Sequence, residues 1–294
     1  MPELPDVTVY VEALAERIVG KPLERVTLMS PFVLRTAVPA IDTLEGKRVA
    51  GIERIGKRIV LAFEGDLFLV LHLMIAGRLR WLSRDAKPPA RITLALLQFA
   101  NGVLAFTEAG TRKRASMHVV EGREQLASFD KGGLEIADAS LEAFTQRLKL
   151  ENHTLKRALT DPGLFSGIGN AYSDEILHRA RLSPIALTQK LDDASVARLF
   201  AATKAVLAEW IERLRTQSAG GFPEKVTAFR PEMAVHGRFN EPCPDCGSPV
   251  QRIVYADNET NYCARCQTGG ARLADRALSR LLKASWPRSI DELG

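Results

Sequence analysis

Residues Cys243-Pro244-Asp245-Cys246 and Cys263-Ala264-Arg265-Cys266 form two cysteine pairs that lie 16 residues apart near the C-terminal end of the chain. Each pair can supply two thiolates from one tight turn, and four thiolates complete the tetrahedral coordination of zinc. No ligand position then remains for a water molecule, so the spacing predicts one structural Zn²⁺. The stretch between the pairs is β-type with a turn at Asp257-Asn258, which predicts a hairpin stabilised by the metal. The alternative interpretation is that the two cysteine pairs are redox-active motifs. It is disfavoured because thiol exchange rarely needs two such pairs in register.

The composition indicates a globular protein with a mild preference for an acidic partner. Hydrophobic residues make up 46% of the 294 residues and charged residues 26%, which excludes disordered and fibrous classes. The net charge of +5 favours a polyanion. All four cysteines lie in the two pairs, a use that suits metal binding in a reducing compartment. Apolar runs stop well short of the roughly 20 residues of a bilayer-spanning helix, and no secretory pattern opens the chain, so we expect a cytoplasmic protein without a membrane partner.

The N-terminal half has the pattern of an antiparallel sheet domain that follows one helix. Apolar residues from Asp6 to Val19 recur at helical spacing, and Gly20-Lys21-Pro22 ends that segment. Short runs rich in branched residues follow, with turn signals such as Asn101-Gly102 between them. The predicted strands are Arg25–Met29, Arg48–Ile55, Arg58–Phe63, Leu67–Leu71, Gly77–Leu82, Ile92–Phe99 and Val103–Thr107. Strands this short and regular predict a sandwich or barrel.

The pattern changes to helices after Asp130, where we place the domain boundary. Predicted helices are Leu141–Leu148, Thr154–Thr160, Ala171–Ala180 and Ala194–Leu214. A polar, glycine-bearing stretch follows, then the cysteine module, and then a basic amphipathic segment at Arg272–Lys283. We therefore divide the chain into residues 1–130, 137–216, 217–238, 239–268 and a tail of 269–294.

The N-terminus can supply a nucleophile. Removal of the initiator methionine is expected before a small residue, and it would place the secondary amine of Pro2 beside the carboxylate of Glu3. An α-amino group has a pKa of about 8, against about 10.4 for lysine, so more of it is neutral at cellular pH. Attack on a sugar C1′ expels the base and leaves an iminium that has no N–H proton to lose. This cation acts as an electron sink for elimination of the 3′ phosphate.

Four separated stretches, in order along the chain, resemble the formamidopyrimidine-DNA glycosylase and endonuclease VIII family. They are Pro2-Glu3-Leu4-Pro5, Ile55-Gly56-Lys57-Arg58, Gly167-Ile168-Gly169-Asn170-Ala171-Tyr172-Ser173-Asp174-Glu175-Ile176-Leu177 and the cysteine module. The resemblance implies an α+β multidomain fold, with an N-terminal helix and β-sandwich (1–130), a helix-two-turns-helix domain (137–216), a lesion loop (217–238) and a zinc hairpin (239–268). It also implies that damaged double-stranded DNA is bound in the cleft between domains, by a monomer that associates with the nucleoid.

The family's functional residues carry over to matching positions. By resemblance, Pro2 is the Schiff-base nucleophile, Glu3 handles protons at the sugar, and Lys57 contacts phosphate and assists elimination. Lys156 and Asn170 match residues that grip the phosphates flanking the lesion. From the residues alone, we would interpret Lys57 as a solvated lysine of a hairpin. The stretch around Asn170 would be interpreted as a turn.

Two positions depart from the family pattern. An Arg-Phe pair that fills the duplex after base extrusion is replaced within Thr107–Arg114, so we expect Met74 or Ile75 to fill the gap, and Arg112 and Arg114 to hold phosphates. Asn258 stands where the family has an arginine that binds phosphates around the flipped nucleotide. We therefore expect weaker binding or arrest after the first elimination.

The tail beyond the last cysteine has two interpretations. Arg272, Arg276, Arg280 and Lys283 recur about one helical turn apart, which gives a basic face that could replace the lost arginine. The alternative is a solvated helix packed by Leu273, Leu278, Leu281 and Trp286.

The start Glu3-Leu4-Pro5 resembles the purine-directed branch, so oxidised purines are the expected substrates. The alternatives are a pyrimidine-directed enzyme, an enzyme that acts only on abasic sites, and a zinc-dependent damaged-DNA-binding protein of the same fold with little glycosylase activity. The joint presence of Pro2, Glu3 and Lys57 favours the enzyme, because a binding protein has no need of an N-terminal proline.

Overall fold

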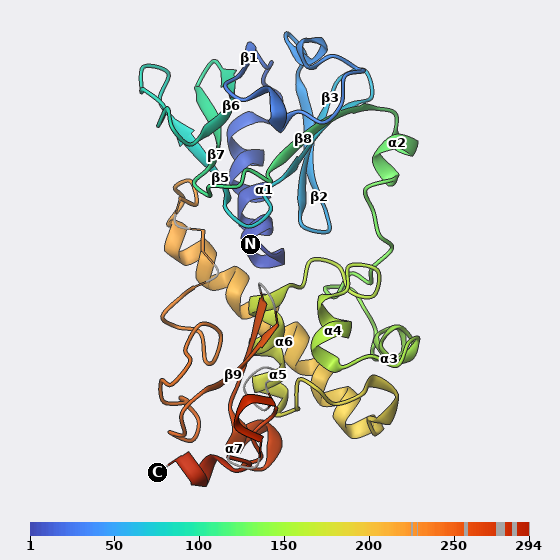
Figure 1. Cartoon of the computed structure of the whole chain (residues 1–294). Helices are drawn as coiled ribbons and strands as arrows, with labels where there is room; N and C mark the ends of the chain where they lie inside the picture. The colour runs from blue at the N-terminus through green and yellow to red at the C-terminus, as the bar shows by residue number, and fades with distance from the viewer. Residues whose placement is uncertain (225, 228, 256–257, 275–279, 284–286, 294) are drawn as a thin grey trace. The chain divides into compact units, whose positions relative to one another are not determined.

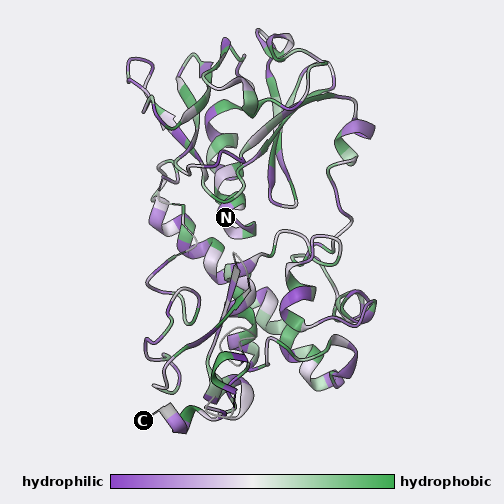
Figure 2. Ribbon diagram, viewed as in Figure 1, coloured by the Kyte–Doolittle hydropathy of each residue, from purple (hydrophilic) through white to green (hydrophobic). Residues whose placement is uncertain are grey.

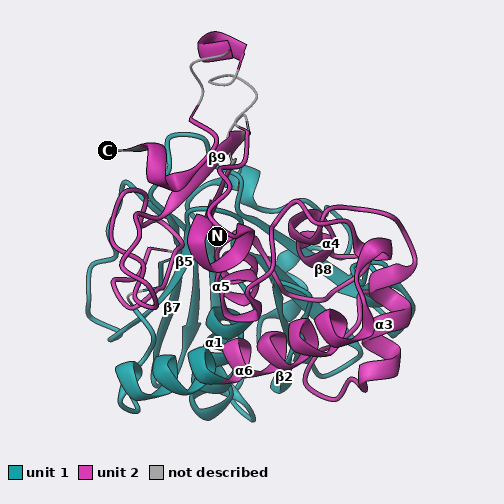
Figure 3. Cartoon of the chain, turned by 90° about the horizontal axis from the view of Figure 1, so that it is seen from below, with its two compact units in different colours: residues 1–131, 209–227 teal, residues 132–208, 228–294 magenta. Residues whose placement is uncertain are grey.

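The computed structural model describes residues 1–224, 226–227, 229–255, 258–274, 280–283 and 287–293. The chain divides into two compact units (Figure 3). Unit 1 comprises Met1–Lys131 and Glu209–Thr227, and unit 2 comprises Gly132–Ala208 and Ala228–Gly294. Helix α6 (Asp193–Ser218) contributes residues to both units. No helix in the described ranges is long and apolar enough to cross a membrane.

Unit 1 combines helix α1 (Leu4–Ile18) with two four-stranded antiparallel sheets (Figure 1). The strand orders are β1-β6-β7-β5 and β2-β3-β4-β8. The strands are β1 (Arg25–Leu28), β2 (Val49–Ile55), β3 (Arg58–Phe63), β4 (Leu67–His72), β5 (Gly77–Leu82), β6 (Thr93–Phe99), β7 (Gly102–Glu108) and β8 (Ser116–Glu121). Short helices lie at Pro31–Val33 (η1), Ile41–Leu44 (η2) and Arg123–Ala127 (α2). The predicted sheet class is confirmed, with seven strands ending within one residue of their predicted bounds.

Three details of unit 1 differ from the sequence prediction. Strand β8 was not predicted, because its run follows a basic loop and carries His118 among apolar residues; it pairs with β4 along its whole length. Helix α1 begins at Leu4 rather than Asp6, since Pro5 is tolerated in a first turn and the Asp6 carboxylate accepts the Glu3 N–H at 3.0 Å. Helix α2 was also not predicted.

The core of unit 1 is built by one face of α1. Val7, Tyr10, Leu14 and Ile18 follow helical spacing and are fully buried against apolar residues of both sheets. Hydrophobic colouring marks α1 and many strand positions in Figure 2. Each such side chain stabilises the fold by about 1.5–3 kcal/mol, and together they hold the start of α1 rigidly in place.

Unit 2 contains helices and a small hairpin. Its elements are α3 (Leu141–Lys149), α4 (Leu155–Thr160), α5 (Asn170–Ala180), η3 (Thr188–Lys190), the first part of α6, β9 (Gln251–Tyr255), β10 (Asn258–Tyr262), α7 (Ala264–Thr268) and η5 (Ile290–Leu293). All four predicted helices are confirmed, and α6 runs one turn beyond its predicted end. Phe144 packs on Phe165 and Phe200 to form an aromatic core, and Val235 and Val250 pack with the cysteines.

The predicted tail helix lies partly outside the described residues. Residues 272–274 have no regular structure and 280–282 are helical, whereas Arg276, Leu278 and Trp286 fall outside the described ranges. Leu273 packs against the cluster that contains Ile253 and Tyr262. Leu281 is 76% exposed, so its predicted packing is wrong.

Candidate functional site

The N-terminal residues form a buried site in unit 1. Pro2 and Glu3 are buried, with Glu3 only 2% exposed, because Glu3 caps α1 and the helix is fixed by its apolar face. Burial lowers the pKa of the amino terminus of Met1 below its ordinary value of 8.0. The charge of Glu3 opposes that change, whereas the charges of Arg78 and Lys57 reinforce it. Two of the predicted catalytic residues, Glu3 and Lys57, thus act on the charge of the amino terminus to which Pro2 is joined.

Arg78 was not singled out from the sequence, although its charge also acts on the amino terminus of Met1. Its guanidinium donates to the carbonyl oxygens of Ile75 at 3.2 Å and Gly77 at 2.6 Å. A third donation goes to the carbonyl oxygen of Val226, in the segment after α6. Three carbonyl acceptors hold the cation in place, and they tie the β4–β5 turn to residues near 226.

The β4–β5 turn presents one of the two predicted duplex-filling residues. Met74 adopts a left-handed backbone with φ 53°, and the Gly77 N–H bonds to the Leu73 carbonyl at 2.9 Å. A Cβ at Gly77 would lie 2.2 Å from that carbonyl oxygen, so only glycine fits. Ile75 at the turn is 56% exposed, whereas Met74 is half-buried. Of the two, Ile75 is the one displayed to solvent.

The basic loop that follows β7 is ordered by a buried carboxylate. Glu108 is 1% exposed and accepts hydrogen bonds from the backbone N–H of Arg114 at 3.0 Å and of Ala115 at 3.2 Å. Arg112 and Arg114 themselves are exposed. The loop therefore offers two cations on a fixed backbone, which suits phosphate contacts.

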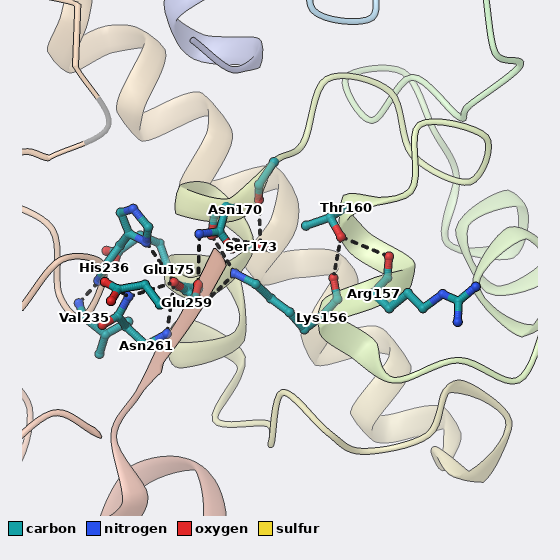
Figure 4. A network of polar contacts seen from close by, with 12 residues as sticks. Lys156, Arg157, Thr160, Asn170, Ser173, Glu175, Val235, His236, Glu259 and Asn261 are labelled. Atoms are coloured by element: carbon teal, nitrogen blue, oxygen red, sulfur yellow. Dashed lines mark hydrogen bonds and ion pairs between the residues drawn. The ribbon is translucent and has the colours of Figure 1, made fainter. Parts of the chain in front are cut away.

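In unit 2 the predicted phosphate-gripping residues are neighbours. The Lys156 ammonium, on α4, lies 2.6 Å from the Asn170 carbonyl oxygen and 2.5 Å from Asp174 Oδ1 (Figure 4). The Asn170 side-chain amide donates to the Glu259 carbonyl of β10 at 2.9 Å. The helical domain and the zinc hairpin therefore meet at the first turn of α5.

Two consecutive acids on α5, absent from the predicted site, organise this region. Besides Lys156, Asp174 accepts from His236 Nδ1 at 2.8 Å and from the Asn261 N–H at 3.2 Å. Glu175 accepts the backbone N–H groups of 234, 235 and 236 at 2.7, 2.9 and 2.9 Å (Figure 4). Asp174 and Glu175 are both buried, and buried carboxylates need partners such as these.

The four cysteines fit a single zinc ion. Their sulfur atoms lie within 4.8 Å of one another, with Cys243 to Cys266 at 3.9 Å and Cys246 to Cys263 at 3.5 Å. Zn–S bonds of about 2.3 Å in a tetrahedron place the sulfurs about 3.8 Å apart, close to these separations. Burial raises the pKa of the metal-free Cys263 thiol to about 11, so binding of zinc must displace protons.

The remaining predicted residues are placed as follows. Asn258 is the first residue of β10 and pairs with Tyr255, and its side chain lies outside the description. Within the predicted lesion loop, Phe222 packs against Tyr10 at 5.6 Å and Trp81 at 6.4 Å, and Val226 is buried. The start of the loop is therefore anchored on unit 1.

Three family models match consecutive parts of the chain. The N-terminal domain of formamidopyrimidine-DNA glycosylase matches residues 1–117, and the H2TH domain of that enzyme matches residues 135–219. A zinc finger found in FPG and IleRS matches residues 240–269.

Curated relatives match along most of the chain. The chain is 33% identical to the formamidopyrimidine-DNA glycosylase of Heliobacterium modesticaldum over 283 residues, which are 91% of this chain and 100% of the relative. It is 34% identical to that of Thermus thermophilus over 280 residues, 92% of this chain and 100% of the relative. An uncharacterized formamidopyrimidine-DNA glycosylase-like protein of Mycobacterium tuberculosis is 41% identical over 152 residues, 51% of this chain and 94% of that protein.

Solved structures share the fold. A complex between Lactococcus lactis Fpg and DNA containing an abasic site is 28% identical, with a TM-score of 0.80 over 90% of this chain and 99% of that chain. A MutM complex with DNA containing carbocyclic 8-oxo-G is 27% identical, with a TM-score of 0.80 over 91% of this chain and 100% of that chain.

Proposed function

This chain belongs to the formamidopyrimidine-DNA glycosylase family, and we propose that it is a bifunctional DNA glycosylase and abasic-site lyase of base-excision repair. Its substrate would be damaged double-stranded DNA, as in the solved complexes of its relatives. The observation that carries the proposal is the burial of Pro2 and Glu3 at the start of α1, where the charges of Glu3 and Lys57 act on the adjoining amino terminus of Met1.

The proposed reaction begins when the Pro2 nitrogen attacks C1′ of the damaged nucleotide. A bond forms between that nitrogen and C1′ while the bond from C1′ to the base breaks, and the base leaves with the electron pair and a proton. Only the neutral amine has a free lone pair, and burial, which lowers the pKa of the adjoining Met1 amine, disfavours the charged form in this environment. The Glu3 carboxylate, which is buried beside Pro2, would move protons to and from the opening sugar.

Strand cleavage would follow from the same intermediate. The lone pair of the Pro2 nitrogen expels O4′ from C1′, so the C1′–O4′ bond breaks, O4′ takes a proton and an iminium forms between Pro2 and C1′. This cation withdraws electrons, so a C2′ proton is lost, a C2′=C3′ double bond forms and the 3′ phosphate leaves with the electron pair of its bond to C3′. Lys57 provides positive charge for the departing phosphate and can assist the proton transfer. Because Asn258 is uncharged where the family has arginine, we propose that the enzyme stops after this first elimination.

Residues outside the reacting centre would position the DNA. Lys156 and Asn170 grip phosphates beside the lesion, and Arg112 and Arg114 hold the backbone from the ordered loop after β7. Ile75 or Met74 fills the space of the extruded base. Oxidised purines are the proposed lesions, given Glu3-Leu4-Pro5, and the enzyme would act as a monomer.

The four cysteines can bind one zinc ion, which is structural because they complete its coordination. When bound, the ion supplies no group to the reaction. Its contribution is to fix β9 and β10 so that Glu259 and Asn261 meet α5.

Borohydride trapping tests the proposal. The full chain would be mixed with duplexes carrying 8-oxoguanine, a formamidopyrimidine, an oxidised pyrimidine or an abasic site, and the cleaved ends sized. Trapping on a purine lesion with a single-elimination end is expected, and Pro2→Gly should abolish trapping while duplex binding persists. Glu3→Gln should retain binding but lose base release.

Each alternative has its own outcome. Trapping confined to oxidised pyrimidines identifies the pyrimidine-directed enzyme, and trapping confined to the abasic site identifies a lyase alone. Tight binding of damaged duplex without any adduct identifies the DNA-binding protein. Unchanged cleavage by Pro2→Gly contradicts the N-terminal mechanism.

A further inference from the structure

Along one face of α5, one residue in each successive turn makes a polar contact with the zinc hairpin (residues 239–268). Asn170, Asp174 and His178 are four residues apart, so they line up along the helix. Asn170 Nδ2 donates to the Glu259 carbonyl at 2.9 Å, and Asp174 accepts the Asn261 N–H at 3.2 Å. The third contact, from His178 Nε2 to Cys243 Sγ at 3.3 Å, reaches a predicted zinc ligand directly.

The His178 contact is buried and directional. His178 is 4% exposed and Cys243 is 2% exposed, so solvent does not compete for either group. A zinc-bound thiolate carries no proton and can only accept, which requires His178 to present Nε2–H. The carboxylate of Asp245 also lies near the ring, 4.0 Å from Nε2, and its side chain is 44% exposed. The sulfur is therefore the closer partner of the ring.

His178 also lies close to other possible metal ligands, so a direct bond from His178 to the zinc ion is an alternative to the hydrogen bond. Its ring, Asp245 and Cys266 place ligand atoms within 4.8 Å of one another. Four cysteine sulfurs already satisfy a tetrahedral zinc, however, and a separation of 3.3 Å from Cys243 Sγ is that of an N–H···S hydrogen bond. The geometry favours support of a ligand over replacement of one.

We propose that His178 is a positioning residue of the zinc centre, whose Nε2–H donates to the Cys243 thiolate and thereby couples zinc occupancy to α5. Charge on the acceptor strengthens such a bond, so it is strongest in the metal-loaded protein. The same helix begins at Asn170 and carries Asp174, which together hold Lys156. Zinc binding thus stabilises the helix face that bears the Lys156–Asn170 contact.

The test compares the zinc-loaded full chain with His178→Phe, which keeps a ring but no donor, and His178→Gln, which keeps an N–H donor. Zinc transfer to a metallochromic chelator should become about 10- to 100-fold more favourable in His178→Phe. His178→Gln should stay close to wild type. Equal zinc retention in all three proteins would overturn the proposal. None of these readouts needs DNA or glycosylase activity, so they stand apart from the proposed function.

Two measurements on the wild-type protein test the proposal even where a variant fails to fold. The absorption spectrum of the Co²⁺-substituted protein should be that of four thiolates, and the spectrum of three thiolates and one nitrogen would make His178 a ligand and refute the proposal. In ¹⁵N spectra of the zinc-loaded protein, Nε2 of His178 should carry a slowly exchanging proton. An unprotonated Nε2 would also refute it.

Discussion

The Lys156 ammonium is held 2.5 Å from Asp174 Oδ1, with the two side chains 13% and 0% exposed. This is a buried ion pair in unit 2, and its anion also accepts from His236 and Asn261. Removal of one partner from such a pair leaves an uncompensated charge, which typically costs about 3–5 kcal/mol. The pair also fixes the Lys156 cation beside Asn170.

We therefore expect Asp174→Asn to destabilise unit 2 by several kcal/mol and to weaken duplex binding at the same time. Lys156→Met should also destabilise unit 2, because it leaves the buried Asp174 carboxylate without its cation. In the folded variant, duplex affinity should fall and the salt slope of binding should decrease by about one. Chemical denaturation and binding titrations over a range of salt concentrations measure both effects.

Lys149→Met is the matched control, because Lys149 pairs with Asp193 at 3.5 Å on the surface, where the side chains are 32% and 99% exposed. Such a pair contributes about 0–1 kcal/mol, so little change in stability is expected. If Lys156→Met left the salt slope at its wild-type value, Lys156 would not be a phosphate contact.

Removal of zinc should unfold the cysteine module before the rest of the chain. Cys243 and Cys263 form part of the small cluster with Val235 and Val250, and this cluster has few apolar side chains of its own. A chelator, or Cys246→Ser, should therefore abolish the protection of residues 240–269 in hydrogen exchange. Strands of unit 1 should keep their protection, and equal loss in both units would contradict a local role for the metal.

Acid should destabilise unit 1 through His72. Burial, with the charges of Arg58, Lys57 and His118, lowers the pKa of His72 from 6.5 to about 4. The unfolded chain then binds more protons between these values, so stability is complete above pH 6.5 and falls as the pH drops toward 4. The loss should be about 2 kcal/mol, allowing for partial exposure of the ring.

Urea denaturation of wild type and His72→Gln between pH 4 and 7 measures this effect. His118 has a pKa lowered in the same direction, mainly by burial, and it persists in the variant. The difference between the two curves therefore reports His72, and parallel curves would show that His72 does not cause the acid sensitivity.

The sequence predicted most of the fold because its signals were local. The apolar runs rich in branched residues, such as Arg58–Phe63, and the glycine and proline turn signals between elements depend on neighbouring residues alone. The spacing of the cysteines likewise follows from the coordination of one ion. Strand β8 lacked such a signal, since His118 breaks its apolar pattern and its pairing with β4 is set by the sheet.

The supporting groups of the site were harder to predict because their partners are distant in sequence. Arg78 meets Val226, and Asp174 meets His236 and Asn261, only after the chain has folded. Nothing local in the sequence distinguishes His178, whose partner Cys243 lies 65 residues away.

The start of the segment after α6 should depend on Phe222. Its ring packs on Tyr10 and Trp81, the Arg17 guanidinium lies 5.5 Å from its centroid, and Arg78 holds the nearby Val226 carbonyl. Because the ring is only half-buried, Phe222→Ala should destabilise unit 1 by about 1–2 kcal/mol, less than a fully buried phenylalanine. Phe32→Ala is the control in the same unit: Phe32 is 78% exposed. It should change stability by less than about 0.5 kcal/mol.

Phe222→Ala also tests whether the segment after α6 contributes to the recognition of a damaged base. Release of residues 221–227 should slow trapping on a duplex with a lesion base more than on an abasic duplex, because only the former has a base to enclose. Arg78→Met should act in the same direction, because the Arg78 guanidinium holds the Val226 carbonyl oxygen. Equal slowing on both duplexes by Phe222→Ala would assign the segment to stability alone.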